Sequence, residues 1–176
     1  MNQLLSLLFL PKERPISFWQ IMDSYKPDQT DIKILNLLQT DGLMTYRQLA
    51  KETHRSQNPI VERVNRLKKL GYITGTVALI NVKKIKSVFT AFPMIQLKNH
   101  SEDTFVSFQE LMKQHSEIME CHHVMGQFDF ILKIVVADAN SYNEFLRKNI
   151  STLEYVLRIE SFPMLAEIKR DTAFKL

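Results

Sequence analysis

The sequence predicts an α+β protein made of two units, and three observations carry this prediction. Apolar residues recur at helical spacing in three segments between residues 28 and 70. From residue 88 the pattern becomes strand, helix, strand, strand, helix, strand, which is the order of a ferredoxin-like βαββαβ fold. The 176 residues are 45% apolar and 24% charged, which is the composition of a folded globular protein rather than a disordered one.

Residues 1–27 are expected to lie outside both units. Their apolar run, Leu4–Leu10, is short, and no Lys or Arg precedes it, which disfavours an export signal. We expect either a flexible extension or a misassigned start, with translation beginning at Met22. No apolar run reaches the ~20 residues that cross a bilayer, so we expect a cytoplasmic protein with no membrane partner.

The first helical segment begins after Asp28, a suitable N-cap, and ends at Asp41 and Gly42. Between these limits the apolar residues Ile32, Leu35 and Leu38 recur at helical spacing. The pattern predicts an amphipathic helix with one buried face.

A tight turn joins the next two helical segments, which predicts a helix-turn-helix. Thr45 and Gln48 form a capping-box pattern that opens the first of them, and it ends near Thr53. The second starts near Ser56, with Pro59 in its first turn. Its apolar positions at helical spacing predict a buried stripe of Ile60, Val64 and Leu67.

The segment Tyr72–Val77 is rich in β-prone residues and contains a glycine, so we expect a small wing or hairpin. Residues 28–75 are therefore expected to form a winged helix-turn-helix unit. Residues 76–87 would form a β linker, and residues 88–176 the ferredoxin-like domain.

The second unit alternates strands and amphipathic helices. Pro93 lies in its first strand, where a missing N–H requires a bulge or an unpaired position, whereas Pro163 suits an edge strand. Several strands are apolar on both faces, so we expect a second copy of the chain to cover the free face of the sheet. The expected strands are Val88–Leu97, Ile118–Met125, Phe130–Ala137 and Val156–Ile168, and the expected helices are Glu102–His115 and Ser141–Ile150.

The net charge of +4 is unevenly distributed. Residues 28–75 hold eight Lys and Arg against five Asp and Glu, whereas residues 76–176 hold twelve of each kind. A basic excess confined to the helical unit favours a polyanion as the partner of that unit.

The polar positions around the helix-turn-helix are suited to reading double-stranded DNA. Asn and Gln can pair with adenine, Arg can pair with guanine, and flanking cations can bind phosphates. A charged face opposite an apolar stripe is also what any solvated helix shows, and Glu62 with Arg66 can simply support the helix. The candidate DNA-contacting residues are Tyr46, Arg47, Ser56, Gln57, Asn58, Val61, Glu62, Arg63, Arg66, Lys68 and Lys69.

Four stretches of the chain resemble the leucine-responsive and asparagine-operon regulators, the Lrp/AsnC family. These stretches are DQTDIKILNLLQTDGLMTYRQLA, SQNPIVERVNRLKKLGYITGTVALIN, ECHHVMGQFDFILKI and EIKRDTAFKL. The resemblance implies a sequence-specific transcriptional regulator with a C-terminal ligand-sensing (RAM) domain and with Ser56–Leu70 as recognition helix. It also implies a homodimer formed by sheets packed face to face, with higher assemblies such as octamers, and an amino-acid effector.

By this resemblance the turn Gly126-Gln127-Phe128-Asp129 lines the effector pocket. Gly126 permits a tight backbone with open N–H groups, and the Asp129 carboxylate could hold a ligand ammonium group. The alternative is that Gly126 only makes a hairpin, which Asp129 caps. Gln127 stands where the family more often has an acidic residue, which puts the nature of the effector in question.

We expect no enzyme activity, no cofactor and no metal site. His122 and His123 are adjacent, so a strand would point them to opposite faces, and Cys121 is expected to be a buried apolar thiol. Two alternatives to the regulator remain open. One is a tetrapyrrole (siroheme) decarboxylase, because some Lrp-like proteins are similar in fold yet act as such enzymes. The other is a ligand sensor that does not bind DNA.

Overall fold

The computed structural model describes residues 25–176, so the expectations for residues 1–24 lie outside the described residues. The chain divides into two units with separate hydrophobic cores. One unit contains the described residues up to Ala78 together with Asp171–Leu176, and the other is Leu79–Arg170. The last six residues thus group with the N-terminal unit, whereas we expected them in the C-terminal one.

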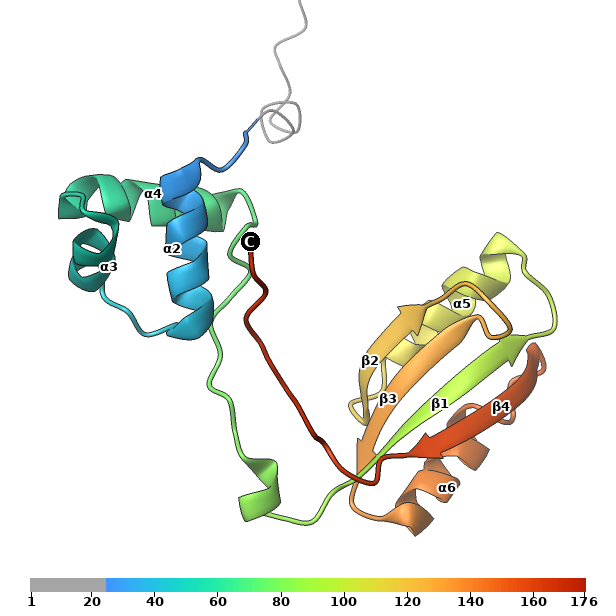
Figure 1. Cartoon of the computed structure of the whole chain (residues 1–176). Coiled ribbons are helices and arrows are strands. Elements are labelled where there is room, and N and C mark those ends of the chain that lie inside the picture. Colours follow the sequence, from blue (N-terminus) through green and yellow to red (C-terminus); the bar gives the residue numbers. More distant parts are fainter. Residues whose placement is uncertain (1–24) are drawn as a thin grey trace, which may run out of the picture. The chain divides into compact units, whose positions relative to one another are not determined.

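Three helices form the N-terminal unit: α2 (Gln29–Thr40), α3 (Tyr46–Thr53) and α4 (Gln57–Lys69) (Figure 1). The expected caps are confirmed. The Asp28 and Thr45 side chains each accept an N–H from the third residue of their helix, and that residue's side chain accepts the N–H of the cap. The core contains Ile34, Leu35, Leu49, Ala50, Ile60, Val64 and Leu67.

The buried face of α2 differs from the expected one. Ile32, which we placed in the apolar stripe, is only partly buried, and the charged residue Asp31 is fully buried beside Ile34 and Leu35. Burying a carboxylate is unfavourable unless partners satisfy it, so Asp31 must be paired.

The wing that we expected after α4 does not form as a hairpin. Residues 72–81 run without helix or strand, and the next element is a short 3₁₀ turn, η1 (Val82–Lys84). Residues 76–80, which follow Gly75, are also β-prone, but neither run forms a strand in the structure and no hairpin pairing is present between residues 72 and 81. The described part of the chain has no helix long and apolar enough to span a bilayer.

The second unit contains one four-stranded antiparallel sheet with strand order β2-β3-β1-β4. Its two helices lie on the same face of the sheet (Figure 1), as the ferredoxin-like order predicts. The elements are β1 (Phe89–Leu97), α5 (Glu102–Lys113), β2 (Ile118–His123), β3 (Phe130–Val136), α6 (Ala139–Asn149) and β4 (Val156–Pro163).

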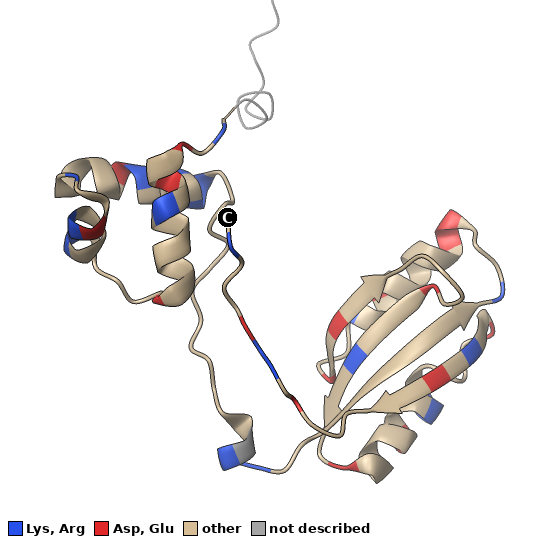
Figure 2. Ribbon diagram, viewed as in Figure 1, with Lys and Arg blue, Asp and Glu red and all other residues tan. Residues whose placement is uncertain are grey.

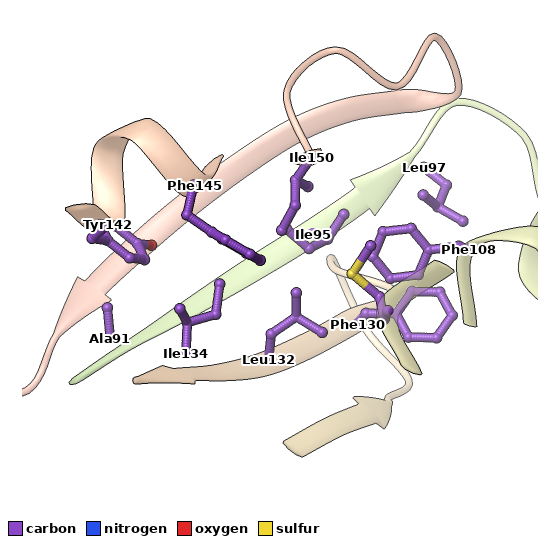
Figure 3. Packing of buried hydrophobic residues seen from close by; sticks show 11 residues of the cluster. Ala91, Ile95, Leu97, Phe108, Phe130, Leu132, Ile134, Tyr142, Phe145 and Ile150 are labelled. Atoms are coloured by element: carbon purple, nitrogen blue, oxygen red, sulfur yellow. The ribbon is translucent and has the colours of Figure 1, made fainter. Parts of the chain in front are cut away.

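The core of this unit lies between the sheet and the two helices (Figure 3). Alternate residues of β1 and β3 point into it, and the rings of Phe108 and Phe130 lie 4.6 Å apart within it. The buried residues from the strands include Ala91, Ile95, Leu97, Phe130, Leu132 and Ile134, and the helices add Phe108, Met112, Tyr142 and Phe145.

Pro93 lies in a central strand, as expected, and no bulge is placed at it. Residues Ala91 and Met94 pair with β3, but Phe92 and Pro93 have no partner there, while the pairing of Pro93 with Ser161 of β4 continues. The missing N–H therefore interrupts the ladder on the β3 side alone. Pro163 ends β4, which is an edge strand as expected.

Candidate functional site

A tight turn separates α3 from α4 and sets the geometry of the helix-turn-helix. His54 adopts a left-handed conformation (φ 54°), and the N–H of Arg55 donates to the carbonyl of Ala50 at 2.9 Å. The hydroxyl of Thr53 donates to the carbonyl of Leu49 at 2.7 Å and is buried. These bonds satisfy the last carbonyls of α3 and let the chain reverse directly into α4.

The faces of α4 follow from its buried stripe. Successive residues of a helix are rotated by about 100° around its axis. Four residues of α4 therefore lie within about 50° of the direction that points away from the buried side chains Ile60, Val64 and Leu67. They form the outward face of α4 and are Asn58, Glu62, Asn65 and Lys69, all of them exposed.

Arg63 lies about 110° away from that direction, on the side of α4 that faces α2. One guanidinium nitrogen, Nη1, donates to Asp31 Oδ1 at 2.8 Å and to Asp28 Oδ2 at 2.7 Å. The Asp31 side chain is only 1% exposed, so this is a buried ionic contact. The two carboxylates raise the pKa of Arg63, and the Asp31 N–H and Arg63 lower the pKa of Asp28.

Arg66 reaches the same carboxylate and the residue that leads into α2. Its Nη2 lies 3.6 Å from Asp31 Oδ1, and its guanidinium lies 4.7 Å from the centre of the Tyr25 ring. The Tyr25 hydroxyl also donates to Asp31, and the Tyr72 hydroxyl donates to the Tyr25 carbonyl at 2.8 Å. Tyr25 is therefore part of the folded unit, although we assigned it to the extension.

We call Tyr25, Asp28, Asp31, Arg63 and Arg66 the Asp31 cluster. It joins the start of α2 to the middle of α4. The cluster corrects the expected orientation of Arg63, because its guanidinium pairs with α2 instead of extending into solvent. The sequence did contain a signal for it: Asp31 falls three positions before Ile34, on the apolar stripe of α2.

The other candidate DNA-contacting residues divide by exposure. Val61 and Tyr46 are partly buried, and Tyr46 packs against the core. Asn65 was missing from the expected set, although it shares the outward face with Asn58 and Glu62. The exposed remainder comprises Arg47, Ser56, Gln57, Lys68 and Lys69.

Lys and Arg residues lie along the helices of the N-terminal unit, with fewer Asp and Glu residues among them (Figure 2). Arg47 and Lys51 are exposed on α3, and Arg55 is exposed in the turn before α4. Asp28 and Asp31 are occupied by Arg63 and Arg66, so two of the unit's acidic residues are neutralised internally. These pairs neutralise two arginines as well, so the local balance rests on Arg47, Lys51 and Arg55 against Glu52, which leaves a positive excess on α3 and the turn that follows it.

The loop Gly126–Asp129 joins β2 to β3. Gly126 has φ 137°, a conformation that other residues rarely adopt, and no atom lies within 4 Å of the place where a Cβ would be. Gly126 and Gln127 are exposed, while Phe128 lies under the Arg158 guanidinium at 5.8 Å. The loop thus presents the backbone of Gly126 and the residue Gln127 to the surroundings.

Asp129 fastens this loop to the sheet. Its Oδ2 accepts the N–H of Leu97 at 2.8 Å, its Oδ1 lies 3.1 Å from His100 Nε2, and its own N–H donates to the carbonyl of Ile95 at 2.9 Å. The side chain is 15% exposed. Both carboxylate oxygens therefore have partners within the chain, and these partners lie at and after the end of β1 instead of in the hairpin that we expected Asp129 to cap as the alternative to ligand binding.

Histidines that looked scattered in the sequence come together near this loop. The rings of His100 and His123 lie 5.8 Å and 4.8 Å from that of Phe105. His122 points to the opposite face, where it contacts Glu120, so the expected divergence of the two adjacent histidines is confirmed. Cys121 was expected to be buried and is exposed, because β2 is an edge strand with exposed residues along its length.

Comparisons with known proteins agree with the division of the chain into an N-terminal and a C-terminal unit. Residues 27–74 match the model for a winged helix-turn-helix DNA-binding domain, and residues 90–174 match the model for the Lrp/AsnC ligand-binding domain. The leucine-responsive regulatory protein of Escherichia coli K12 is 34% identical over 143 residues, which are 81% of this chain and 87% of that protein. The same protein of Klebsiella pneumoniae gives equal values.

Two solved structures extend the likeness to three dimensions. A transcriptional regulator of Neisseria meningitidis in complex with L-Met has a TM-score of 0.78 at 26% identity, covering 85% of this chain and 96% of that one. An AsnC family transcriptional regulator of Agrobacterium tumefaciens has a TM-score of 0.77 at 29% identity, covering 84% and 95%. The chain therefore belongs to the Lrp/AsnC family of transcriptional regulators, with a helix-turn-helix DNA-binding unit and a C-terminal ligand-binding domain.

Proposed function

We propose that this regulator reads double-stranded DNA with the outward face of α4 in the major groove. The observation that carries the proposal is the Asp31 cluster. By holding Arg63 and Arg66 against α2, the cluster fixes the rotation of α4 about its axis, so that the polar residues Asn58, Glu62 and Asn65 are presented together.

The chemistry of this face suits base edges. Asn58 and Asn65 can each pair with N6 and N7 of adenine, and Glu62 can accept from N4 of cytosine. Arg47 and Lys51 on α3, with Ser56 and Gln57 at the start of α4, are placed to bind phosphates and fix the register. Arg63 then serves to position α4, whereas the sequence suggested a direct contact with DNA.

The sheet face opposite the helices supports a homodimer. Phe92, Met94, Ile131 and Phe162 project from this face and are partly or fully exposed. The face also carries the pairs Lys133–Glu120 and Arg158–Glu160. We propose that a second copy covers the apolar centre, which would place two copies of α4 on DNA half-sites about 34 Å apart, or a multiple of that distance.

We also propose that an amino acid binds at the loop Gly126–Asp129 and modulates DNA binding. The L-Met bound to the relative from Neisseria meningitidis supports this ligand class. Since both oxygens of Asp129 are engaged, we assign it to holding the loop. The exposed backbone of Gly126 and the side chain of the exposed residue Gln127 are then placed to meet the ligand. An effector can act only if it binds two states of the regulator unequally.

The test of DNA binding uses the full chain. Genomic footprinting selects bound sites, and titration against one such duplex and a scrambled duplex is repeated at several salt concentrations. We expect tighter binding to the selected duplex and a linear fall of log K with log salt concentration. Arg47→Ala should reduce the size of the slope by about 1 on both duplexes. Equal affinity for the two duplexes would contradict the proposal.

The test of the effector uses thermal unfolding. The full chain is heated with L-methionine and, in parallel, with each of the other common amino acids. A ligand that binds the folded state raises the midpoint, and Gln127→Ala should reduce that rise while leaving the unliganded midpoint unchanged. A midpoint that none of these amino acids shifts would contradict this part of the proposal.

A further inference from the structure

The C-terminal segment of the chain docks on helix α2 of the DNA-binding unit. The side-chain amide of Gln39 donates to the carbonyl of Phe174 at 2.9 Å, and its oxygen accepts the N–H of the same residue at 2.6 Å. One turn earlier on α2, Asn36 Oδ1 accepts the N–H of Leu176 at 3.4 Å. Gln39 thus pairs with the backbone of Phe174 much as a neighbouring β-strand would.

Nothing in the local sequence requires this contact. Gln39 and Phe174 are 135 positions apart, and the last six residues form neither helix nor strand. The side chains of Phe174 and Leu176 stay 76% and 51% exposed, so the docking buries little apolar surface. Two amide side chains on one face of α2 therefore recognise the backbone of the tail and not its side chains.

Such docking is reversible by its nature. Exposed hydrogen bonds exchange with water and contribute little net stability, while ordering the end of the chain has an entropic cost. A segment held in this way lies near the balance between docked and free, where a small perturbation changes its population.

The segment emerges from the ligand-binding domain. Ten residues, 164–173, join the end of β4 to Phe174, the first docked residue, and a chain of that length spans at most about 36 Å. The linker before β1 is the other covalent connection between the two units. Docking of the tail therefore attaches the DNA-binding unit to its sensor domain at two points instead of one.

We propose that residues 172–176 form a releasable second tether. When docked on Asn36 and Gln39, the tail restricts the orientations open to the helix-turn-helix and favours duplexes with one half-site spacing. A change in the ligand-binding domain that displaces the end of β4 pulls the tail away and relaxes this restriction. The inference deepens the proposed function and depends on it for its effect on DNA.

Amide hydrogen exchange of the full chain tests the docking itself, without DNA. We expect the Phe174 amide to exchange roughly tenfold more slowly than in a free peptide, since local opening of a weak contact is frequent. Gln39→Ala should restore the free rate, and Gln39→Glu should do the same, because a carboxylate cannot donate to the Phe174 carbonyl. Gln29→Ala, at the other end of α2, is the matched control and should leave the protection intact.

A second arm tests the consequence for DNA. Gln39→Ala should weaken binding to a duplex with two half-sites by about fivefold and leave a single half-site within twofold, because only the first needs both recognition helices in register. Free-peptide exchange at Phe174 in the unmodified chain would overturn the docking. Protection that Gln39→Ala removes without changing two-site affinity would overturn the tether. Absence of any DNA binding would instead reject the proposed function and leave the exchange result standing.

Discussion

The guanidinium of Arg63 in α4 lies 2.8 Å from the buried carboxylate of Asp31 in α2. This contact joins the helix that we propose to read DNA to the helix that begins the fold. It gives a basic residue in the middle of α4 a structural partner, and it leaves the outward face of α4 to Asn58, Glu62, Asn65 and Lys69.

The first prediction concerns the coupling of these two residues. Asp31→Ala and Arg63→Ala should each lower the free energy of unfolding of the N-terminal unit by about 1–3 kcal/mol, because the first removes a carboxylate partner of Arg63 and the second removes the closest partner of Asp31. Asp28 still faces Arg63 in the first variant, and Arg66 still faces Asp31 in the second. The double variant should be about as stable as either single one. Urea unfolding of the four proteins gives the coupling energy.

An additive double variant would show that the two side chains act independently and would contradict the Asp31 cluster. Asp31→Asn keeps the shape of the residue and serves where Asp31→Ala fails to fold. Arg55→Ala, which removes an exposed arginine from the preceding turn, is the control and should change stability by less than about 0.5 kcal/mol.

The second prediction separates the two roles considered for Asp129. Because its carboxylate accepts the Leu97 N–H and faces His100, Asp129→Ala should lower the free energy of unfolding of the C-terminal domain by about 1–3 kcal/mol without any ligand. His100→Ala should have an effect below about 1 kcal/mol, since the imidazole is 65% exposed. A ligand-binding carboxylate with no structural role would leave unliganded stability unchanged.

The third prediction concerns acid stability. The pKa of Asp28 is lowered by the N–H of Asp31 and by Arg63, and the pKa of Glu120 is lowered by Lys133 and His122. A carboxylate whose pKa is lower in the folded state stabilises that state above its unfolded pKa, and the contribution is lost as the pH falls through the folded pKa. Stability should therefore decline below about pH 4.5.

Two variants identify the groups responsible. Asp28→Asn keeps a good N-cap but has no charge to titrate. Glu120→Gln likewise removes the titrating charge from strand β2 while keeping a similar side chain. Each should flatten the dependence of the urea midpoint on pH between about 3 and 5, the first in the N-terminal unit and the second in the C-terminal domain. Midpoints that fall as steeply in both variants as in the parent would show that other carboxylates dominate.

The fourth prediction concerns the free face of the sheet. Ile131→Glu places a charge among the apolar residues of that face and should convert the proposed dimer to monomers in sedimentation analysis. Val106→Glu is the matched control, because Val106 is an exposed apolar residue on helix α5, which lies on the other face of the sheet. Equal dissociation by both variants, or by neither, would contradict an interface on this face.

The sequence predicts elements better than it predicts long-range partners. Local patterns locate all three helices of the N-terminal unit, the N-cap Asp28, the capping box at Thr45 and the order of strands and helices along the second unit, because caps and periodicity act over a few residues. The rotation of Arg63 depends on Asp31, 32 positions away, and the contact of Phe174 depends on Gln39. Neither pairing has a local signal beyond the single charge in the apolar stripe of α2.

The exposed Cys121 and the missing wing hairpin show the same limit. The Cys121 expectation came from its place in a strand and the wing expectation from β-prone composition, but exposure depends on whether a strand is at an edge, and hairpin formation depends on pairing. β2 is an edge strand, and residues 72–81 form no strand although they are rich in β-prone residues.

Specificity of binding by an Asn58→Ala variant of the full chain tests the central claim most directly. The affinity for a footprinted duplex and for its scrambled counterpart is measured for the parent, for Asn58→Ala, and for Asn143→Ala as an exposed helical control in α6. We predict that Asn58→Ala lowers the specific affinity by about tenfold or more and leaves the scrambled duplex unchanged, whereas Asn143→Ala changes neither. An unchanged ratio of the two affinities in Asn58→Ala would contradict the placement of this face of α4 in the major groove.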